Sequence, residues 1–339
     1  MKKSEGNRKE AVFAKGKQEP QYLAIKELHE DKGWSINWLC NVYGIARSSY
    51  YKWLNRKPTQ NELESHELAN IILDYDERFG HILGYRRMTE WINVLNHKQY
   101  NYKRVHRIMN LLGIHAVIRA KRSNYKKSTP QVTAQNLLAR DFSASKPNEK
   151  WVTDVSEFKI KGMKKKLYLS IIMDLYDCSI VAVHISDRNN NKLVFNTYKK
   201  AIKANPGAKP MLHSDRGFQY TSKVFKAKLD KQGIVQSMSR VGCCIDNGPM
   251  EGLWGIIKSE MYYLNEFHTF QELKKAIMKY ISFYNNERFQ SRFNIQTPIQ
   301  VREAAMRTTE PIQYVIPKNR KIEEYKRHLQ QKQQASIYA

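Results

Sequence analysis

Acidic residues stand in three short motifs that lie far apart in this sequence. Asp154 ends the stretch Trp-Val-Thr-Asp, Asp215 follows His-Ser, and Glu251 ends Asp-Asn-Gly-Pro-Met-Glu, with thirty-five residues between Asp215 and Glu251. Carboxylates spaced in this way can meet only if a folded core brings three distant segments together. Carboxylate oxygens are ligands that Mg²⁺ prefers, and two such ions about 3.5 to 4 Å apart can activate an attacking oxygen and stabilise a leaving one in phosphodiester chemistry.

The sequence around these motifs alternates between strand-like and helix-like patterns. Residues 151–158 are rich in β-forming side chains, and 167–175 form a nearly continuous apolar run, as expected of a central strand. Strand, helix, strand, helix and strand are then predicted at 180–185, 191–204, 211–214, 222–231 and 234–237. This order, with two more helices beyond it, predicts an α/β fold of the ribonuclease-H-like kind: a mixed five-stranded sheet with flanking helices.

Each acid has a predicted position within this order. Asp154 falls in the middle of the first strand, and Asp215 falls at or just past the end of the fourth. These two strands are candidates for neighbours in the sheet. Glu251 falls in the first turn of a helix that we expect Asn247 to cap, with Pro249 accepted near the helix start.

Each acid also has an alternative interpretation. Asp215 precedes Arg-Gly and is a candidate turn former, Glu251 suits a helix dipole without any metal, and Asp154 could lie at a strand edge. Four further acids compete for the same roles: Glu157, Asp174, Asp177 and Asp246. The positions of Asp174 and Asp177 favour a turn between strands, and that of Asp246 favours the loop before the helix. Spacing alone does not settle the choice.

Short helical patterns near the N-terminus indicate a first helix-turn-helix. Cys40, Gly44 and Tyr50 have the small, glycine and apolar spacing of that motif, whose second helix can enter a major groove. We predict that Arg47 and Lys52 on this second helix contact DNA. An ordinary helical hairpin is the alternative.

A second helical region, 58–120, is also predicted to bind DNA. Between Glu90 and Asp141 the sequence has ten Lys and Arg residues and no acid, with tyrosines among them. Such a run is usually a solvated face, but the absence of acids favours a surface that follows phosphates. The residues predicted to contact DNA here are Arg86, Arg87, Lys103, Arg104 and Arg107.

The charge balance makes a polyanion the expected partner. The chain has 58 Lys and Arg against 32 Asp and Glu, a net charge of +26, and each phosphate that they neutralise releases counterions. An anionic membrane surface would also attract this charge, but no apolar run reaches the ~18 residues of a spanning helix. The N-terminus lacks a signal peptide and the four cysteines lack metal-site or disulfide spacing, so a cytoplasmic protein is expected.

Composition and pattern together predict six segments. They are a disordered basic N-terminus (1–20), a helix-turn-helix region (21–57), the second helical DNA-binding region (58–120), a basic linker (121–148), the catalytic core (149–305) and a basic tail (306–339).

Several motifs together resemble one known family. They are W-V-T-D, H-S-D-R-G-x-Q-Y, Q-S-M-S-R, D-N-x-x-M-E, Tyr284-Asn285 with Arg288, and Thr297-Pro298. The combination runs from about residue 84 to 298 and resembles the OrfB-type transposases of family three of the bacterial insertion sequences. These belong to the same superfamily as retroviral integrases. The chain departs from the family pattern at three positions, none a carboxylate: Cys243, Gly248 and Gln290.

The resemblance implies a DDE triad of Asp154, Asp215 and Glu251 that binds two Mg²⁺ ions, with Mn²⁺ as a substitute. It also assigns DNA contacts to Arg240 and to Lys258, the family's lysine seven residues after the glutamate. By this resemblance, water cleaves a phosphodiester at the element's end and the freed 3′-OH attacks a second one. An oligomer on DNA, at least a dimer, is expected, and a protein from an upstream reading frame is a candidate partner.

We therefore expect a DNA transposase that acts on the terminal inverted repeats of its element and on target DNA, in the bacterial cytoplasm and associated with the nucleoid. One alternative is a sequence-specific DNA-binding regulator that has kept the fold and lost the chemistry; the presence of all three acids speaks against it. The other alternative is a ribonuclease-H-like nuclease that only hydrolyses. Strand joining separates that enzyme from a transposase.

Helix geometry gives Lys258 a second argument. On a continuous helix from Gly248, residues Glu251, Gly255 and Lys258 share one flank beside an apolar stripe, at roughly 100° per residue. Lys258 would then face the same DNA as Glu251, and Gly255 would permit a close approach of the backbone. The alternative is a solvated surface lysine.

Overall fold

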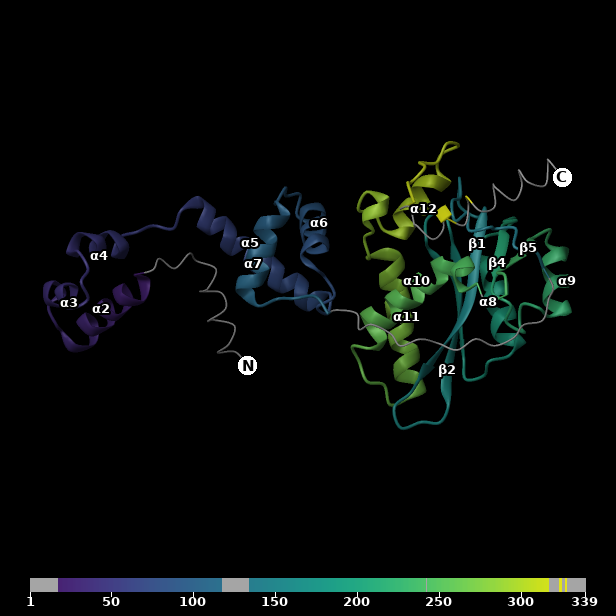
Figure 1. Ribbon diagram of the computed structural model, residues 1–339, viewed down its shortest axis with the longest axis horizontal. Coiled ribbons are helices and arrows are strands. Elements are labelled where there is room, and N and C mark those ends of the chain that lie inside the picture. The colour runs from purple at the N-terminus through teal and green to yellow at the C-terminus, as the bar shows by residue number, and fades with distance from the viewer. Residues whose placement is uncertain (1–17, 118–133, 242, 317–322, 325–326, 328–339) are drawn as a thin grey trace. The chain divides into compact units, whose positions relative to one another are not determined.

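The computed structural model describes residues 18–117, 134–241, 243–316, 323–324 and 327 (Figure 1). The chain divides into two compact units, residues 1–118 and 119–339. No helix in the described ranges is long and apolar enough to cross a membrane.

The described part of the N-terminal unit begins with three short helices, α2 (Glu19–Lys32), α3 (Ile36–Val42) and α4 (Arg47–Leu54). Gly44 has a φ of 64°, a left-handed conformation that lets the chain turn sharply from α3 into α4. The helices share a small core of Ile25, Leu39, Cys40, Ile45 and Tyr50. The predicted succession of helix, turn and helix is therefore present, and its contact with DNA stays a prediction.

Three more helices follow in the same unit: α5 (Gln60–Arg78), α6 (Tyr85–Leu95) and α7 (Tyr102–Leu112). Thr59 and Glu62 form a capping box that satisfies free backbone N–H groups at the start of α5. Apolar side chains from all three helices are buried, among them Leu68, Ile72, Met88, Trp91, Val105 and Met109. All three helices lie within the second helical region predicted at 58–120.

The second unit is built on a five-stranded sheet, which confirms the predicted fold class. Its strands are β1 (Lys150–Lys159), β2 (Lys166–Asp174), β3 (Ile180–Ser186), β4 (Met211–Ser214) and β5 (Val235–Met238). Their order across the sheet is β3-β2-β1-β4-β5. The first three strands pair antiparallel, whereas β4 runs parallel to both β1 and β5. The sheet is therefore mixed, with β1 at its centre.

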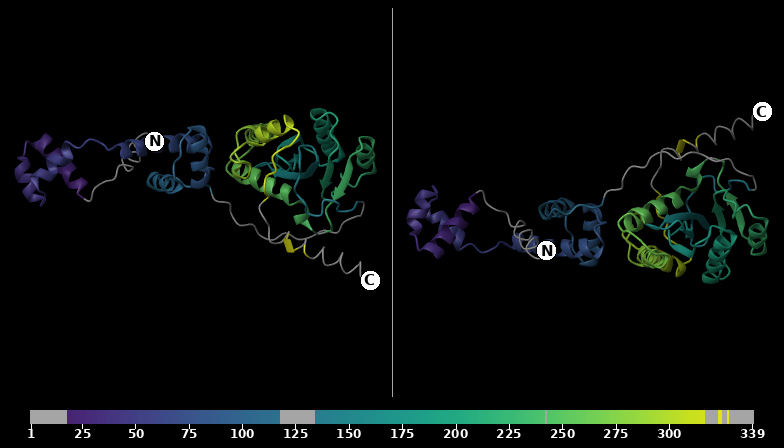
Figure 2. Two further views of the ribbon diagram at one scale, coloured as in Figure 1. Left: turned by 90° about the horizontal axis from the view of Figure 1, so that it is seen from above. Right: turned by 90° about the horizontal axis from the view of Figure 1, so that it is seen from below.

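Helices cover both faces of this sheet (Figures 1 and 2). On one face α8 (Asn191–Ala204) and α9 (Lys223–Lys231) pack against the sheet through Val194, Tyr198, Phe225 and Leu229. On the other face lie α10 (Gly248–Ile257) and α11 (Phe270–Asn286), with Leu253, Ile257, Ile277 and Tyr284 in the larger core. The helix α12 (Pro298–Met306) follows α11 and contacts it.

Alternation along β1 decides which way its acid points. Trp151 belongs to the core on the α8 and α9 side, and Val152 belongs to the core on the α10 and α11 side. Because successive side chains of a strand point to opposite faces, Asp154 faces the same way as Val152. The central strand thus aims this carboxylate at α10.

The predicted linker at 121–148 differs from the structure, because its described residues pack on the core. Leu138 is buried, and the Ser237 hydroxyl of β5 accepts hydrogen bonds from the backbone N–H groups of Leu137 and Leu138, at 3.0 Å each. An apolar side chain and backbone bonds to β5 hold this stretch in place. Residues 134–148 therefore belong with the core, and 118–133 lie outside the described residues.

The two predicted terminal segments lie partly outside the described residues. Helix α2 begins at Glu19, inside the stretch predicted to be disordered, and 1–17 are not described. At the other end, Tyr314 packs on Phe293, and its hydroxyl donates to the Gln296 side chain at 3.0 Å. The start of the predicted tail is thus fixed against the core.

A buried guanidinium holds α12 to the sheet. Arg302 donates to Asp174 at 3.0 Å and to Asp177 at 2.9 Å, and both carboxyls are fully buried. Burial raises the pKa of Asp177 to about 6 and that of Asp174 above its ordinary value, and the Arg302 charge opposes both shifts. Each carboxyl also accepts a hydrogen bond from the backbone N–H two residues later, Asp174 from Tyr176 at 2.9 Å and Asp177 from Ser179 at 2.8 Å, which agrees with the predicted turn role of the two acids.

We predict that Arg302→Met lowers the free energy of unfolding by about 3 to 5 kcal/mol, because it leaves two buried carboxyls without their guanidinium. Urea denaturation followed by tryptophan fluorescence measures the change. Arg307→Met is the matched control, since the Arg307 side chain on the same helix is 81% exposed and lies 3.8 Å from Glu303. Its effect should stay within about 0.5 kcal/mol. Equal losses in the two variants would contradict this account of the buried cluster.

Candidate active site

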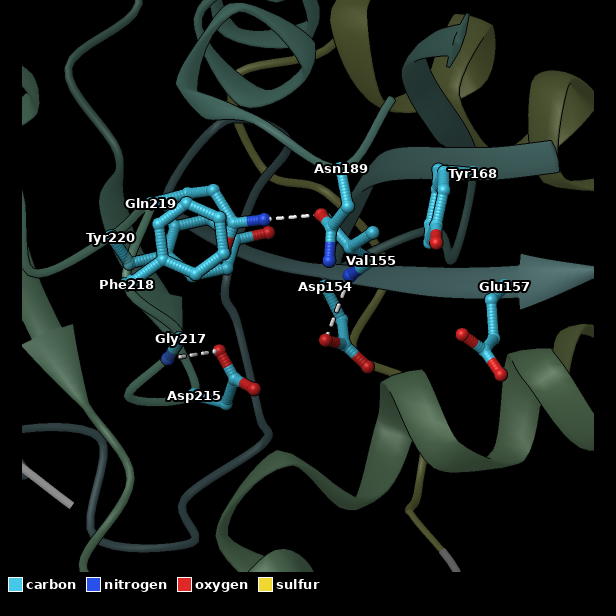
Figure 3. A pocket seen from close by; sticks show the side chains of 10 residues that line it. All are labelled: Asp154, Val155, Glu157, Tyr168, Asn189, Asp215, Gly217, Phe218, Gln219 and Tyr220. Carbon is cyan, nitrogen blue, oxygen red and sulfur yellow. Dashed lines mark hydrogen bonds between the residues drawn. The ribbon is translucent and has the colours of Figure 1, made fainter. Parts of the chain in front are cut away.

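Two of the predicted acids meet because β1 and β4 are parallel neighbours. Thr153 is paired with Ser214 across these strands, so the next residues, Asp154 and Asp215, lie side by side. Both line one cavity of about 250 Å³, and Figure 3 shows their carboxyl groups on facing sides of it. The predicted positions of both acids and the predicted neighbourhood of their strands are confirmed.

The Asp154 side chain is half-buried, and its carboxyl receives two hydrogen bonds. Its Oδ1 accepts from the backbone N–H of Val155 at 2.7 Å, and its Oδ2 accepts from the indole N–H of Trp254 at 2.9 Å. Burial raises the pKa of Asp154 to about 7, the charges of Asp215 and Glu251 add to the rise, and the two N–H donors oppose it. Three like charges in low dielectric explain this direction.

Asp215 is held by the tight turn that follows β4. Its Oδ1 accepts from the backbone N–H of Gly217 at 2.9 Å, and burial raises the pKa of this carboxyl. A Cβ added at Gly217 would lie 3.0 Å from Asp215 Oδ1 and 3.1 Å from Gln219 Oε1, so a larger residue would crowd both side chains. The turn-forming role weighed for Asp215 is therefore present together with its place in the cavity.

Glu251 lies in the first turn of α10, as predicted, but it stands apart from the other two acids. Its side chain is exposed and does not line the cavity, although its charge acts on Asp154. Within the described ranges, no three His, Cys, Asp or Glu side chains are close enough together to hold a metal ion. The structure thus brings together two acids of the predicted triad and sets the third nearby.

The predicted capping role of Asn247 is wrong. Asn247 occupies the N-cap position of α10 but makes no capping hydrogen bond with its side chain. Its side-chain N–H instead donates to the backbone carbonyl of Thr153 at 3.2 Å, and its Oδ1 is buried without a hydrogen-bond partner among the described residues. A contact with the central strand has replaced the local cap, and it fixes α10 beside Asp154. Pro249 does lie near the helix start, as predicted.

The donors available here fit a hard divalent cation. Asp154, Asp215 and Glu251 offer only carboxylate oxygens, the ligand type that Mg²⁺ and Mn²⁺ prefer, and the cavity contributes no thiol or imidazole. The buried amide oxygen of Asn247 is a further oxygen donor without a partner in the described part of the chain. The chemistry of the donor set therefore suits these ions.

The competing acids have other partners. Asp246 is buried, accepts hydrogen bonds from Arg140 and Arg240, and has a pKa of about 2; burial alone would raise it, but these guanidinium contacts outweigh burial. Glu157 lines the cavity but is half exposed and pairs with Lys166 at 2.8 Å. Together with the Arg302 cluster, these pairs account for all four of the competing acids.

Sequence reasoning singled out none of the remaining cavity residues for a role. Gln219 donates a hydrogen bond to Asn189, the Tyr220 hydroxyl lies 3.2 Å from that of Thr153, and the Phe218 ring is 57% exposed. Gln219 and Tyr220 belong to the H-S-D-R-G-x-Q-Y motif around Asp215, so the motif could have identified them as cavity residues. Asn189 is the first of three consecutive asparagines, and nothing in the sequence indicates that it lines the cavity.

The predicted DNA contacts on the helices have different surroundings. Arg47, Lys52, Lys103 and Arg107 are exposed. Arg104, in contrast, is half-buried and bonds to three residues of α5: Asn61, Glu64 and Ser65. Within α6, the Arg86 side chain donates to the Tyr85 hydroxyl at 3.1 Å and the Arg87 guanidinium lies over the Trp91 ring.

The two predicted DNA contacts of the core also have partners within it. Arg240 bonds to Asp246, and the Lys258 ammonium lies 5.3 Å from the centre of the Phe158 ring. The expected continuous helix is wrong at this point, because α10 ends at Ile257 and Lys258 begins a π-helical turn, Lys258–Tyr262. A role of either residue on DNA stays a prediction.

Family models match most of the described chain. Two models described as "Integrase core domain" match residues 144–244 and 251–306, and a model described as "HTH-like domain" matches 62–122. The first two cover the sheet and the helices α8 to α12, and the third covers α5, α6 and α7. The fold and these matches define a DNA-acting polynucleotidyl transferase of the integrase type.

Relatives give the family. InsK of Escherichia coli K12, which is named a transposase of insertion sequence element IS150, is 40% identical over 261 residues, 76% of this chain and 90% of its own length. InsF of the same organism, the transposase for insertion sequence IS3A, is 28% identical over 267 residues, 77% of this chain and 90% of its own. The chain belongs to the IS3 family of insertion-sequence transposases.

A solved structure of the HTLV-2 integrase catalytic core domain in complex with magnesium is also similar. It is 23% identical, covers 46% of this chain and 96% of its own, and has a TM-score of 0.37.

We predict that Asp215→Asn stabilises the metal-free protein at pH 8. A carboxyl with a folded-state pKa above its unfolded value binds its proton more tightly when folded, so the wild type loses stability as pH rises above the ordinary aspartate pKa of about 4. The asparagine keeps an oxygen for Gly217 N–H and removes one of the clustered charges. With EDTA present, its Tm should exceed the wild-type value by roughly 2 to 8 °C at pH 8, and the gap should narrow toward pH 5. Scanning calorimetry at both pH values tests this, and a variant less stable than the wild type at pH 8 would refute it.

Proposed function

We propose that this transposase cleaves the ends of its insertion element and joins the freed 3′-OH groups to target DNA at the cavity that Asp154 of β1 and Asp215, just after β4, line. Asp154, Asp215 and Glu251 are the catalytic residues and the metal ligands. The observation that carries the proposal is the meeting of Asp154 and Asp215 in one cavity, at neighbouring strands of an integrase-type sheet.

The acids act by holding two Mg²⁺ ions, for which Mn²⁺ substitutes. When bound, the ions lower the pKa of an attacking water and neutralise charge on the phosphate. Asp154, at the centre of the sheet, is suited to contact both ions, and Asp215 and Glu251 each contact one. The raised pKa of Asp154 means that it must lose its proton to serve as a ligand near neutral pH.

Two successive displacements on phosphorus complete the reaction. In the first, water forms a new P–O bond at the element's end, and the 3′ oxygen leaves and takes up a proton. In the second, this 3′-OH attacks a target phosphodiester, whose own 3′ oxygen leaves. No covalent bond to the protein forms in either step.

Glu251 completes the site by turning toward the other two acids. Its side chain is exposed on the first turn of α10, on the helix whose Trp254 already contacts Asp154. Without cations, three carboxylates repel one another, and Glu251 has the longest side chain and the least burial of the three. A bound cation would offset that repulsion, and Glu251 would then complete the set of carboxylate ligands with Asp154 and Asp215.

The helical unit recognises the ends of the element. Exposed Arg47 and Lys52 on α4 and exposed Lys103 and Arg107 on α7 support contacts with terminal inverted repeats, and the net charge of +26 supports phosphate binding throughout. Arg86, Arg87, Arg104, Arg240 and Lys258 contribute further contacts. The working form is a dimer or larger oligomer on two DNA ends, in the cytoplasm at the nucleoid, with an upstream-frame protein as a candidate partner.

We predict that Asp154→Asn, Asp215→Asn and Glu251→Gln each lose both end cleavage and strand joining while still binding DNA. Each change removes a ligand worth several kcal/mol to the transition state, roughly a thousandfold in rate. The assay uses labelled terminal-repeat DNA and a plasmid target in Mg²⁺. Glu157→Gln is the matched control, an acid of the same cavity that pairs with Lys166, and it should keep most activity. Strand joining by any of the three variants would show that the wrong acids were chosen, whereas wild-type cleavage without joining would favour the nuclease.

Charge reversal should separate DNA contacts from internal ones on α7. Lys103→Glu and Arg107→Glu should weaken binding to terminal-repeat DNA and lower the salt dependence by about one counterion unit per lost phosphate contact. Arg104→Glu should in addition lower the Tm, because Arg104 bonds to Glu64 of α5. Fluorescence anisotropy from 50 to 300 mM salt, on repeat and unrelated DNA, measures the DNA affinity and its salt dependence. Unchanged affinity of the Lys103 and Arg107 variants would remove α7 from the interface.

A further inference from the structure

Trp254 joins the helix of Glu251 to the carboxyl of Asp154. It lies on α10, one turn after Glu251, and its side chain is only 6% exposed. Its indole N–H donates to Asp154 Oδ2 at 2.9 Å. An indole nitrogen can only donate, so this contact needs an acceptor and suits an ionised carboxylate. The same ring packs edge-on against Phe158 of β1, with ring centres 6.5 Å apart.

The bond fixes the orientation of the Asp154 carboxyl. Oδ2 accepts from the Trp254 indole and Oδ1 accepts from the Val155 backbone N–H at 2.7 Å. Each oxygen thus has one N–H donor and keeps a second lone pair for another partner. Loss of the indole donor would free the carboxyl to rotate about its side-chain bonds.

The same bond also limits the separation of β1 and α10, the elements that carry Asp154 and Glu251. Asp154 belongs to β1 and Glu251 to α10, and these elements are tied beside the cavity by the Trp254 indole and by the Asn247 bond to the Thr153 carbonyl. Rigid partners of metal ligands set ligand orientation, and their loss commonly weakens metal affinity about 10- to 100-fold.

We propose that Trp254 is a positioning residue: its indole N–H holds the Asp154 carboxyl and the helix of Glu251 in the arrangement that admits divalent cations. This inference rests on the proposed function of Asp154 and Glu251 as ligands. It adds a residue that holds a ligand without contacting cation or DNA.

Another tryptophan, which lies on β1, provides the matched control for Trp254. Trp151 is fully buried, and its indole N–H donates to the buried carboxyl of Asp174 at 3.2 Å. The pair has the same chemistry as Trp254 with Asp154, but Asp174 also bonds to Arg302 and neither member lines the cavity. A tryptophan that only stabilises the fold should behave like Trp151.

The test compares Trp254→Phe and Trp151→Phe in the full-length chain. Titration with Mn²⁺, followed by the electron paramagnetic resonance signal of the free ion, gives the dissociation constant without any DNA reaction. We expect Trp254→Phe to weaken Mn²⁺ binding about tenfold or more and to raise the Mn²⁺ concentration for half-maximal end cleavage in parallel. Trp151→Phe should lower the Tm and leave both quantities at wild-type values.

Wild-type Mn²⁺ affinity in folded Trp254→Phe would overturn the proposal, and so would equal loss of affinity in both variants. If Trp254→Phe does not fold, benzothienylalanine at position 254 keeps the ring shape, replaces the N–H with sulfur and carries the same expectations. Asp154→Asn separates this proposal from the one on which it rests. If that variant keeps wild-type affinity, the ligand assignment itself is wrong; if it loses affinity while Trp254→Phe does not, only the role of Trp254 is wrong.

Discussion

The parallel pairing of β1 with β4 is the constraint on which the candidate site depends. It sets Thr153 opposite Ser214, and this register alone brings Asp154 and Asp215 to the same cavity. Two ionised carboxyls at such a position repel each other, which is one reason why the pKa of Asp154 rises to about 7. The hydrophobic packing on both faces of the sheet offsets that repulsion, so the fold keeps an arrangement that is unfavourable until positive charge arrives.

The approach of α10 is fixed by polar contacts of the two residues that precede it, Asp246 and Asn247. Asp246, just before the helix, is buried and bonds to Arg140 and Arg240. Arg140 belongs to the stretch 134–148, which packs on the core ahead of β1, so this stretch also secures the loop before Glu251. With Asn247 bonded to the central strand, the position of the third acid depends on contacts that span most of the core.

Local patterns predicted the elements well, and distant contacts escaped prediction. The strand at 211–214 and the helices at 47–54 and 191–204 have the predicted bounds, because turn residues and periodicity encode them locally. Asn247 is one example. The local pattern predicted that its side chain caps α10, but its side-chain N–H donates to the backbone carbonyl of Thr153, 94 residues earlier in the sequence. The Trp254 indole on Asp154 and the packing of 134–148 on the core are contacts of the same kind. Resemblance supplied the triad, whereas spacing alone had left seven acids in competition.

The partners of these acids separate them better than their spacing does. Asp174, Asp177 and Asp246 each bond to arginine, and Glu157 pairs with lysine, so their charge is balanced within the protein. In the part of the chain that the structure describes, no lysine or arginine forms an ion pair with Asp154 or Asp215; each accepts only neutral N–H donors. In a chain with 58 Lys and Arg residues, basic partners are plentiful. A half-buried acidic pair without a basic partner is neutralised either by a proton or by a bound cation. The electrostatics of the pair therefore favour a metal site independently of any relative.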